Sequence, residues 1–245
     1  MGSRRRLVTP ECLDSLLPND PRAMRSRNDL RRVHRAMRTF SILKGAVAEL
    51  SLVPQPRRIL ELGAGDGTLL LRLATALRPR WADVELTLLD RQDVVSPVTR
   101  EAFKRLGWEV TVLLEDALEW AQSPPLRNYD LCITTLFLHH FDDGRLGPLL
   151  AGVAERSRSF IACEPRRNQV ARLGSRLIGL LGANEVTRED GIKSVAAGFN
   201  DCELTRAWPQ GKGDWSINEY LAWPFTHCFL ASRYSPPAPL CHHEH

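Results

Sequence analysis

The chain has 245 residues, of which 43% are apolar and 25% charged, and its formal net charge is +4. This composition is typical of a globular protein with one large domain, or one domain and an appendage. The mild positive charge gives no reason to expect a nucleic-acid partner. No uncharged apolar run approaches the roughly 18 residues of a membrane helix, so we expect no membrane association. Six scattered cysteines without a C-x-x-C pair, and no long apolar segment near the N-terminus, predict a reduced, cytoplasmic location.

The first 56 residues are predicted to be helical. Thr9-Pro10 and Asp20-Pro21 each place a capping residue before a proline, which is typical of a helix start. Between residues 28 and 50 the apolar residues recur at steps of three or four, which predicts one amphipathic helix. The arginines on its other face either are solvated, or belong to a helical lid whose inner face includes His34, or bind nucleic acid.

Three alternating glycines, Gly63, Gly65 and Gly67, separate a short strand predicted at residues 59–62 from a helix predicted at residues 68–77. Glycines let the backbone approach a ligand closely, and a helix N-terminus offers unpaired N–H groups, so this turn predicts a cofactor site. The dinucleotide fingerprint G-x-G-x-x-G requires its third glycine one residue later, where this chain has a threonine. A tight turn without a ligand is the alternative.

The stretch from Glu61 to Gly67 resembles motif I of the class I S-adenosylmethionine-dependent methyltransferases, whose usual form is E/D-x-G-x-G-x-G. The resemblance implies that S-adenosylmethionine is the cofactor and S-adenosylhomocysteine the product. It also implies that Glu61 supports the methionine amino group, directly or through a water. Gly63, Ala64 and Gly65 would pass beneath the methionine moiety, and Gly67 completes the cofactor-binding turn.

The next two strands, predicted at residues 84–89 and 108–114, are each followed by acidic residues. A carboxylate accepts two hydrogen bonds at once, and the resemblance implies that Asp90 holds both ribose hydroxyls, with Arg91 beside it at the cofactor. After the third strand, the resemblance implies that Asp116 receives the adenine amino group. The backbone N–H of Ala117 would meet a ring nitrogen of the adenine.

Two further residues, Trp120 and Leu136, are candidates for contact with the cofactor. Trp120 either covers the adenine face or belongs to the core. Leu136 comes just after a fourth strand, predicted at residues 129–135, and the resemblance places it against the cofactor.

His139 and His140 also follow the fourth strand, at the edge of the sheet where ligands lie in this class of fold. The L-H-H sequence is similar to that of small-molecule methyltransferases acting on quinol, phenolic and polyketide-derived rings. It is unlike the D/N-P-P-Y of enzymes that methylate amino groups of DNA bases, which counts against that activity. Phe137, Leu138 and Phe141 are expected to form an apolar wall around the acceptor.

A phenol must lose a proton on methylation, and an imidazole titrates close to neutral pH. His139 and His140 are therefore the catalytic candidates and His34 is the third, although each could instead be structural. Carbon methylation needs a base later or not at all, so the acceptor atom stays open. A metal site within residues 139–143 is conceivable, but we predict no dedicated metal site.

The C-terminal half predicts more helices and strands. A helix at residues 146–155 precedes a strand at 159–163, and four apolar residues indicate another amphipathic helix: Val170, Leu173, Leu177 and Leu180. Residues 184–199 lack clear periodicity and are expected to line the substrate pocket. Asn200 and Glu203 form a capping-box pattern before a short helix that ends at Ala207.

The chain closes with a hairpin and a tail. The alternating pattern of residues 215–221, followed by residues 226–231, predicts the antiparallel strands six and seven of the family. Residues 234–245 have the composition of a disordered end, and their Cys241, His242, His243 and His245 could bind metal adventitiously.

Together these elements predict an α/β fold: a Rossmann-like, seven-stranded methyltransferase sheet, parallel except for the closing hairpin. Residues 1–56 are expected to form an N-terminal helical cap, 57–233 the methyltransferase domain and 234–245 the tail. The predicted function is methyl transfer to a small, aromatic acceptor, of a kind found in secondary metabolism. The alternatives are a non-catalytic cofactor-binding subunit and an RNA or protein methyltransferase. The oligomeric state is left open.

Overall fold

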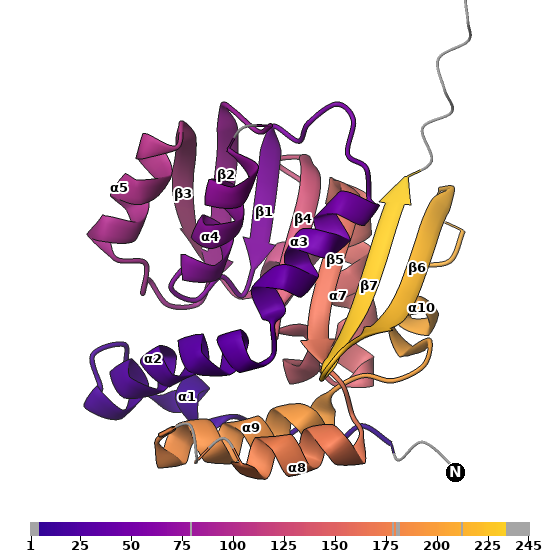
Figure 1. Ribbon diagram of the computed structural model, residues 1–245. Helices are drawn as coiled ribbons and strands as arrows, with labels where there is room; N and C mark the ends of the chain where they lie inside the picture. Colours follow the sequence, from indigo (N-terminus) through magenta and orange to yellow (C-terminus); the bar gives the residue numbers. More distant parts are fainter. Residues whose placement is uncertain (1–4, 79, 178, 180–181, 212, 234–245) are drawn as a thin grey trace, which may run out of the picture.

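The computed structural model describes residues 5–78, 80–177, 179, 182–211 and 213–233. Within them a seven-stranded sheet has the order β3-β2-β1-β4-β5-β7-β6 (Figure 1). The strands are β1 (Arg58–Leu62), β2 (Val84–Asp90), β3 (Trp108–Leu114), β4 (Tyr129–Thr135), β5 (Ser157–Pro165), β6 (Trp215–Ala222) and β7 (Thr226–Arg233). The first five pair in parallel, and β7 pairs antiparallel with both β5 and β6. The predicted Rossmann-like sheet with a closing hairpin is confirmed.

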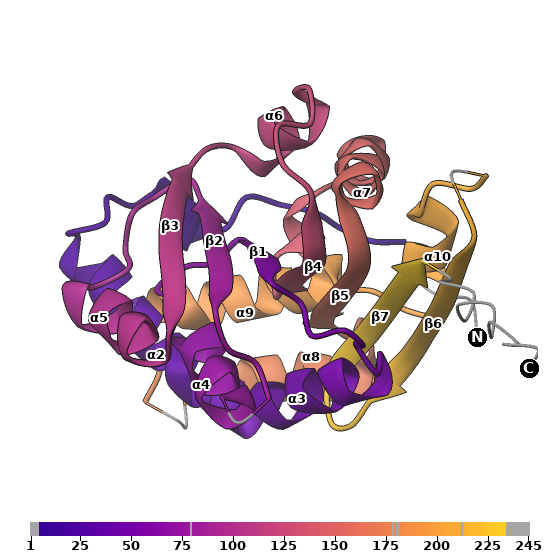
Figure 2. The same ribbon diagram turned by 90° about the horizontal axis from the view of Figure 1, so that it is seen from above.

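Helices cover both faces of this sheet (Figure 2). One face carries α3 (Thr39–Glu49), α4 (Thr68–Leu77) and α5 (Pro97–Arg105), and the other carries α6 (Ala117–Gln122), α7 (Asp143–Arg156) and α10 (Glu203–Ala207). Alternate side chains of β1 supply both cores: Ile59 joins the cluster under α3, α4 and α5, whereas Leu60 and Leu62 join the cluster under α6 and α7. Full burial of one such side chain stabilises the fold by about 1.5–3 kcal/mol.

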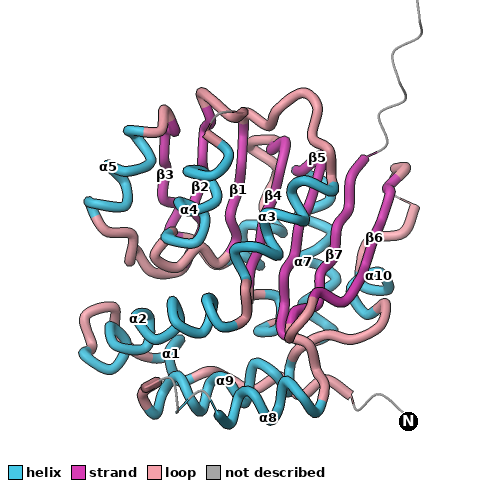
Figure 3. Tube along the Cα trace, viewed as in Figure 1, coloured by secondary structure: helices cyan, strands magenta, loops and turns pink. Residues whose placement is uncertain are grey.

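A further group of helices lies across the carboxyl ends of the parallel strands (Figure 3). It consists of α1 (Cys12–Ser15), α2 (Pro21–Ala36), α8 (Gln169–Leu177) and α9 (Glu185–Ala197). The short 3₁₀ helix η1 (Leu138–His140) follows β4 toward the same side and contacts α9. Ligands in parallel α/β sheets bind at the carboxyl ends of the strands, so this group encloses the expected site.

The predicted single helix of residues 28–50 is wrong, because the chain breaks it into α2 and α3. Arg38 lies between them with a φ of 57°, a left-handed conformation that no helix continues. The apolar spacing runs through the break, but its two halves face different surroundings. Met37 lines a cavity at the carboxyl ends of the parallel strands, whereas Leu43 and Val47 are buried in the core beside α4. Helix α3 therefore packs on the sheet, although the predicted cap included it.

Two other local predictions differ from the structure. Thr9-Pro10 starts no helix: the chain there has no regular secondary structure, and α1 begins only at Cys12 after the N-cap residue Glu11. Conversely, residues 185–197 form the helix α9, which the sequence did not predict. Helix α9 contacts α1, α2 and α8 on several of its sides. Its buried residues therefore form no single stripe that a sequence period could reveal.

The amphipathic helix predicted from Val170 onward is confirmed as α8, but its apolar stripe faces outward. Val170 is 62% exposed, Leu173 58% and Leu177 48%, while Ala171 and Ser175 are buried. Leu180 lies outside the described residues, as does the predicted tail at residues 234–245. None of the helices in the described ranges is long and apolar enough to cross a membrane.

Gly152 marks the closest approach of two helices and gives a test of the packing. A Cβ at this position of α7 would lie 2.5 Å from the Cβ and the carbonyl oxygen of Ala121 in α6. Gly152→Ala should therefore destabilise the protein by about 1–3 kcal/mol through overpacking. Gly45→Ala is the matched control, since that exposed glycine of α3 has no atom within 4 Å of an added Cβ. It should stabilise by about 0.5–1 kcal/mol. Urea unfolding of both variants measures these changes, and equal effects would contradict the packing.

Candidate active site

A cavity of about 1080 Å³ lies between the carboxyl ends of β1, β2, β3 and β4 and the helices α1, α2, α8 and α9. Most residues predicted from the sequence line it. On the cofactor side these are Glu61, Gly63, Ala64, Gly65, Asp90, Arg91, Asp116, Ala117 and Leu136. His34, His139 and His140 line the same cavity. The structure therefore brings both predicted groups to one space.

The glycine turn after β1 is fixed to the end of β2. The N–H groups of Gly63 and Ala64 donate to the carbonyl oxygen of Leu89 over 2.9 and 3.1 Å. The N–H of Gly65 donates to Oδ2 of Asp90 over 2.9 Å. Gly65 has a φ of 54°, and a Cβ added there would meet no protein atom within 4 Å. The turn thus leaves open space beside its backbone, as a cofactor cradle requires.

Gly67 is the predicted cofactor residue that the structure does not place on the cavity wall. Its φ of 69° is that of the left-handed residue preceding α4, and an added Cβ would lie 3.3 Å from the side chain of Leu88. Gly67 is therefore needed for the turn itself and for packing against β2, and it offers no surface to a ligand.

Glu61 is a buried carboxylate with an unsatisfied atom. Its Oε2 is buried and has no hydrogen-bond partner among the described residues. Burial raises the pKa of Glu61 well above its usual range, and the nearby Asp66 and Asp90 act in the same direction. An unpaired buried carboxylate is costly, so this position favours a cationic ligand group.

Asp116 and Leu136 border the cavity with distinctive geometry. Oδ1 of Asp116 caps α6 by accepting the N–H of Leu118 over 2.8 Å, while its Oδ2 lies 4.0 Å from the guanidinium of Arg91. Leu136 has a φ of 53°, a strained conformation of the kind that gathers at functional sites. Trp120 is buried in the core beside Arg156 and does not line the cavity, so the core alternative is the one observed.

His139 is buried between two carboxylates. Its Nδ1 lies 2.8 Å from Oε2 of Glu164, and its Nε2 lies 3.3 Å from Oε1 of Glu11. Burial opposes the charged form, but the hydrogen bonds to Glu11 and Glu164 raise the pKa of His139 to about 9. An imidazole that holds its proton at neutral pH cannot accept another, so the structure speaks against His139 as a general base.

The other two histidines are placed differently. His140 is half-buried; its Nδ1 lies 3.1 Å from Oδ2 of Asp14 and its Nε2 3.9 Å from Oε2 of Glu11. His34 projects from α2, and its Nδ1 is buried without a hydrogen-bond partner among the described residues. Burial lowers the pKa of His34 to about 4, so its ring is neutral at pH 7.

The predicted apolar wall is partly observed. Phe137 and Phe141 line the cavity with a T-shaped contact between their rings, whose centroids are 5.2 Å apart. Leu138 turns into the core between the sheet and α7 and does not face the cavity. Further apolar residues come from the helices that cross the strand ends: Leu13, Leu30, Val33, Met37 and Val195.

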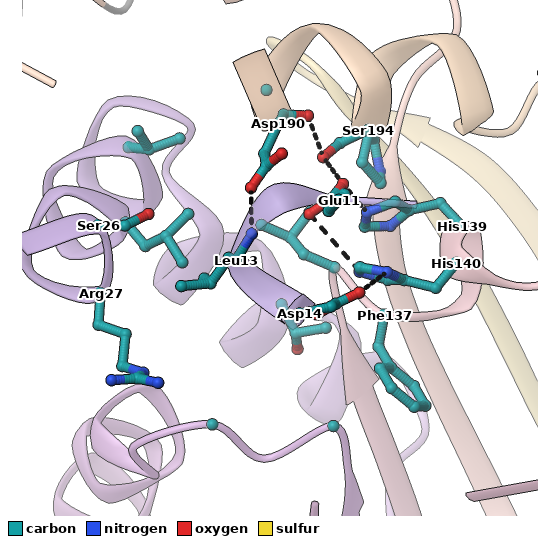
Figure 4. A pocket seen from close by; sticks show the side chains of 18 of the residues that line it. Glu11, Leu13, Asp14, Ser26, Arg27, Phe137, His139, His140, Asp190 and Ser194 are labelled. Atoms are coloured by element: carbon teal, nitrogen blue, oxygen red, sulfur yellow. Dashed lines mark hydrogen bonds and ion pairs between the residues drawn. The ribbon is translucent and has the colours of Figure 1, made fainter. Parts of the chain in front are cut away.

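The N-terminal segment contributes residues that the sequence analysis missed. The N–H of Leu7 donates to the carbonyl oxygen of Ala196, and Asp190 accepts the N–H groups of Cys12 and Leu13 over 2.7 and 2.9 Å. These bonds direct Glu11 toward the histidines (Figure 4). The sequence analysis predicted that residues 184–199 line the pocket, but it did not predict that the N-terminal segment binds to them.

Comparisons with known proteins agree with the resemblance seen in motif I. Residues 59–159 match the model of a family described as a methyltransferase domain. A search of curated protein sequences finds no match. The solved structure of the plantazolicin methyltransferase BpumL, with a pentazolic desmethylPZN analog and S-adenosylhomocysteine, is 14% identical with a TM-score of 0.60. The alignment covers 88% of this chain and 92% of that one.

Two more solved structures have the same fold. Magnesium protoporphyrin IX methyltransferase (ChlM) from Synechocystis PCC 6803, with bound S-adenosylhomocysteine, is 16% identical with a TM-score of 0.54, over 84% of this chain and 86% of that one. An O-methyltransferase family protein from Burkholderia thailandensis is 18% identical with a TM-score of 0.53, over 89% of this chain and 61% of that one.

Proposed function

We propose that this chain is an S-adenosylmethionine-dependent methyltransferase that acts on a small acceptor with an apolar ring system. Motif I predicted this class, and the match of residues 59–159 to a methyltransferase domain supports it. The observation that carries the proposal is the cavity of about 1080 Å³ at the strand ends. Pockets for one drug-sized ligand have volumes of about 300–1000 Å³, so this space suits a cofactor and a compact acceptor together.

The residues at the strand ends fit the cofactor. The unpartnered Oε2 of Glu61 suits the methionine ammonium group, and the open space beside Gly65 suits the methionine chain. Asp90 would hold the ribose hydroxyls. Asp116 would hold the adenine amino group through the oxygen that is not engaged in capping α6, with Ala117, Arg91 and Leu136 beside the ring.

The acceptor would lie at the other end of the cavity, where apolar side chains predominate. Val33 and Met37 of α2, Val195 of α9 and Phe137, which all line the cavity, would surround this end. Flat ring systems bury much apolar area against such walls. The similar enzymes named above act on plantazolicin and on magnesium protoporphyrin IX, which are far smaller than a nucleic acid or a protein, and this supports a small acceptor.

Positioning supplies most of the rate in this proposal, because well-oriented reactants save roughly 7–11 kcal/mol of the barrier. The bound cofactor provides an electrophilic methyl group: the acceptor atom forms a bond to its carbon, the carbon–sulfur bond breaks, and the electron pair stays on sulfur. The chain contributes a closed space, with α1 and α2 as a cap that excludes water. Of the two histidines after β4, His140 would be the acceptor contact, and His139 would be held by Glu164 and Glu11.

Methylation assays on the purified full chain test this function. Phenols, quinols and hydroxylated polycyclic compounds should yield S-adenosylhomocysteine, while transfer RNA and histone peptides should not. Cofactor binding without turnover on any acceptor would favour a non-catalytic subunit, and turnover on RNA or protein alone would overturn the proposal.

Asp90→Ala should weaken binding of S-adenosylmethionine by about 1–3 kcal/mol, because the ribose hydroxyls lose their acceptor in a buried site. Asp130→Ala is the matched control, since Asp130 also accepts two backbone N–H groups, those of Arg57 and Arg58, at the opposite end of the sheet. Calorimetric titration should give wild-type affinity for the control. Equal losses in both variants would mean that Asp90 acts through the fold and not on the cofactor.

A further inference from the structure

We propose that Glu11, His139 and His140 form a binding site for one divalent transition-metal ion at the acceptor end of the cavity. One ligating atom from each residue lies within 4.8 Å of the others. The closest pair, Nε2 of His139 and Oε1 of Glu11, is 3.3 Å apart, and Nε2 of His140 is 3.9 Å from Oε2 of Glu11. Two ligand atoms at about 2.1 Å from a tetrahedral ion are about 3.4 Å apart, so small side-chain movements complete the site.

The outer partners of both histidines are those of metal ligands. Glu164 faces Nδ1 of His139 at 2.8 Å, and Asp14 faces Nδ1 of His140 at 3.1 Å. An ionised carboxylate can only accept, so each ring carries a hydrogen on Nδ1. The hydrogen that Nε2 of His139 directs at Glu11 is displaced when an ion binds, and both rings then present the lone pair of Nε2. Metal-binding histidines are oriented by the same kind of bond from the second ring nitrogen to a carboxylate. Both Nε2 atoms then converge on Glu11.

Glu11 is held in place from α9. Asp190 accepts the N–H groups of the two residues after Glu11, and the hydroxyl of Ser194 donates to Oε1 of Glu11. Figure 4 shows the carboxylate of Glu11 between this helix and the two imidazole rings. Its side chain is only 12% exposed. The third ligand is therefore fixed as firmly as the histidines, although it is 128 residues away from His139 in the chain.

Charge favours a cation at this point. Glu11, Asp14 and Glu164 bring three carboxylates around two imidazoles, so the group has an excess of negative charge even when both rings are protonated. Two imidazoles and one carboxylate suit zinc, cobalt and nickel better than magnesium or calcium, which prefer oxygen ligands. Three protein ligands also leave a tetrahedral ion one open position, as in catalytic zinc sites.

The role of the ion rests on the proposed function. All three ligands line the cavity, so the open position is available to an oxygen of the acceptor. A hydroxyl bound to the ion releases its proton to solvent more readily, and the resulting oxygen anion then takes the methyl group.

Metal titrations of the full chain test the site. Because Cys241, His242, His243 and His245 can bind metal themselves, every protein should carry serine or asparagine at these four positions. Calorimetry with Zn²⁺, and absorption spectra with Co²⁺, should show one equivalent bound. Glu11→Gln and His140→Asn should each lower the Zn²⁺ affinity at least about tenfold, a loss that even an outer-shell change produces. Glu189→Gln, on the exposed side of α9 next to Lys193, is the matched control and should bind as the parent does.

The outcomes separate the site from its role. Absence of binding in the parent, or equal binding by all variants, overturns the site. Stoichiometric binding that is lost in Glu11→Gln and His140→Asn, with unchanged circular dichroism spectra, supports it. If the metal-free parent methylates its acceptor as fast as the zinc-loaded parent, the site stands and its role in methyl transfer falls. If neither form has turnover while Zn²⁺ still binds, the proposed function fails and the metal site does not.

Discussion

Glu61→Gln should stabilise the cofactor-free protein and, at the same time, weaken its binding of S-adenosylmethionine. The buried Oε2 of Glu61 has no partner among the described residues, and its burial raises the pKa of this carboxyl well above the usual range. The folded protein therefore binds more protons than the unfolded chain between about pH 4.5, the unfolded value, and the raised pKa. Its stability falls as the pH rises through that interval.

Glutamine keeps the shape of the side chain and removes this pH dependence. The gain in stability should be close to zero near pH 4.5 and should reach about 1 kcal/mol or more by pH 8. Cofactor binding should lose the charge-assisted bond to the methionine ammonium group, worth about 1.5–3 kcal/mol, or roughly ten- to hundredfold in affinity.

Unfolding midpoints as a function of pH and calorimetric titration measure the two effects of Glu61→Gln. Glu85→Gln is the control, because Glu85 lies on the neighbouring β2 but is only half-buried, beside Arg58 and Arg127. It should change neither quantity beyond about 0.5 kcal/mol. A Glu61→Gln variant that binds the cofactor as the wild type does would remove Glu61 from the cofactor site.

Glu164→Ala should cost about 3–5 kcal/mol of stability, the largest loss that we expect from a single polar substitution in this chain. The Glu164 side chain is fully buried and accepts the N–H groups of Phe137 and Leu138 over 3.0 and 2.9 Å. It also bonds Nδ1 of His139. Alanine would leave these donors without an acceptor and His139 without its partner.

Two further variants make the Glu164 result interpretable. Glu164→Gln keeps a carbonyl oxygen for the backbone donors, so it should lose less than half as much stability as alanine. Glu155→Ala, on the exposed side of α7, should stay within about 0.5 kcal/mol of the wild type. Urea unfolding followed by circular dichroism gives the order of stability of the three variants. If Glu164→Ala is no less stable than Glu155→Ala, the carboxylate does not hold the loop after β4.

The sheet and the cofactor side of the cavity were predictable because their signals are local. Each parallel strand is an apolar run that ends at a glycine, an acidic residue or a polar loop. The residues of motif I, Glu61 to Gly67, are consecutive in the sequence. The places of Asp90 and Asp116 at the cavity follow from strand order, since parallel strands bring their carboxyl ends to one edge, whereas their roles toward the cofactor came from the resemblance. Gly67 does not line the cavity, and the sequence could not show this because ligand-binding and turn-forming glycines share one pattern.

The acceptor side was not predictable in the same way. Glu11 and Asp190 are isolated acidic residues whose partners are far away in the chain, and no period or spacing marks them. The break at Arg38 also has no glycine or proline to announce it. The proposed metal site could not be predicted for the same reason: the sequence shows two adjacent histidines, but the nearest acidic residues in sequence, Asp142 and Asp143, do not belong to the group that could hold an ion.

The bonds between residues 6–13 and residues 190–197 bear on the order in which the protein folds during synthesis. Strands β1 to β4 can pair once residue 135 has been made, and the glycine turn can form with them. The segment that carries Glu11 must wait until α9 has left the ribosome, because Asp190 and the carbonyl oxygens of Ala196 and Ala197 hold it. Contacts of such sequence separation form late and slow folding. The nascent chain would therefore be able to bind its cofactor before it acquires the wall that selects an acceptor.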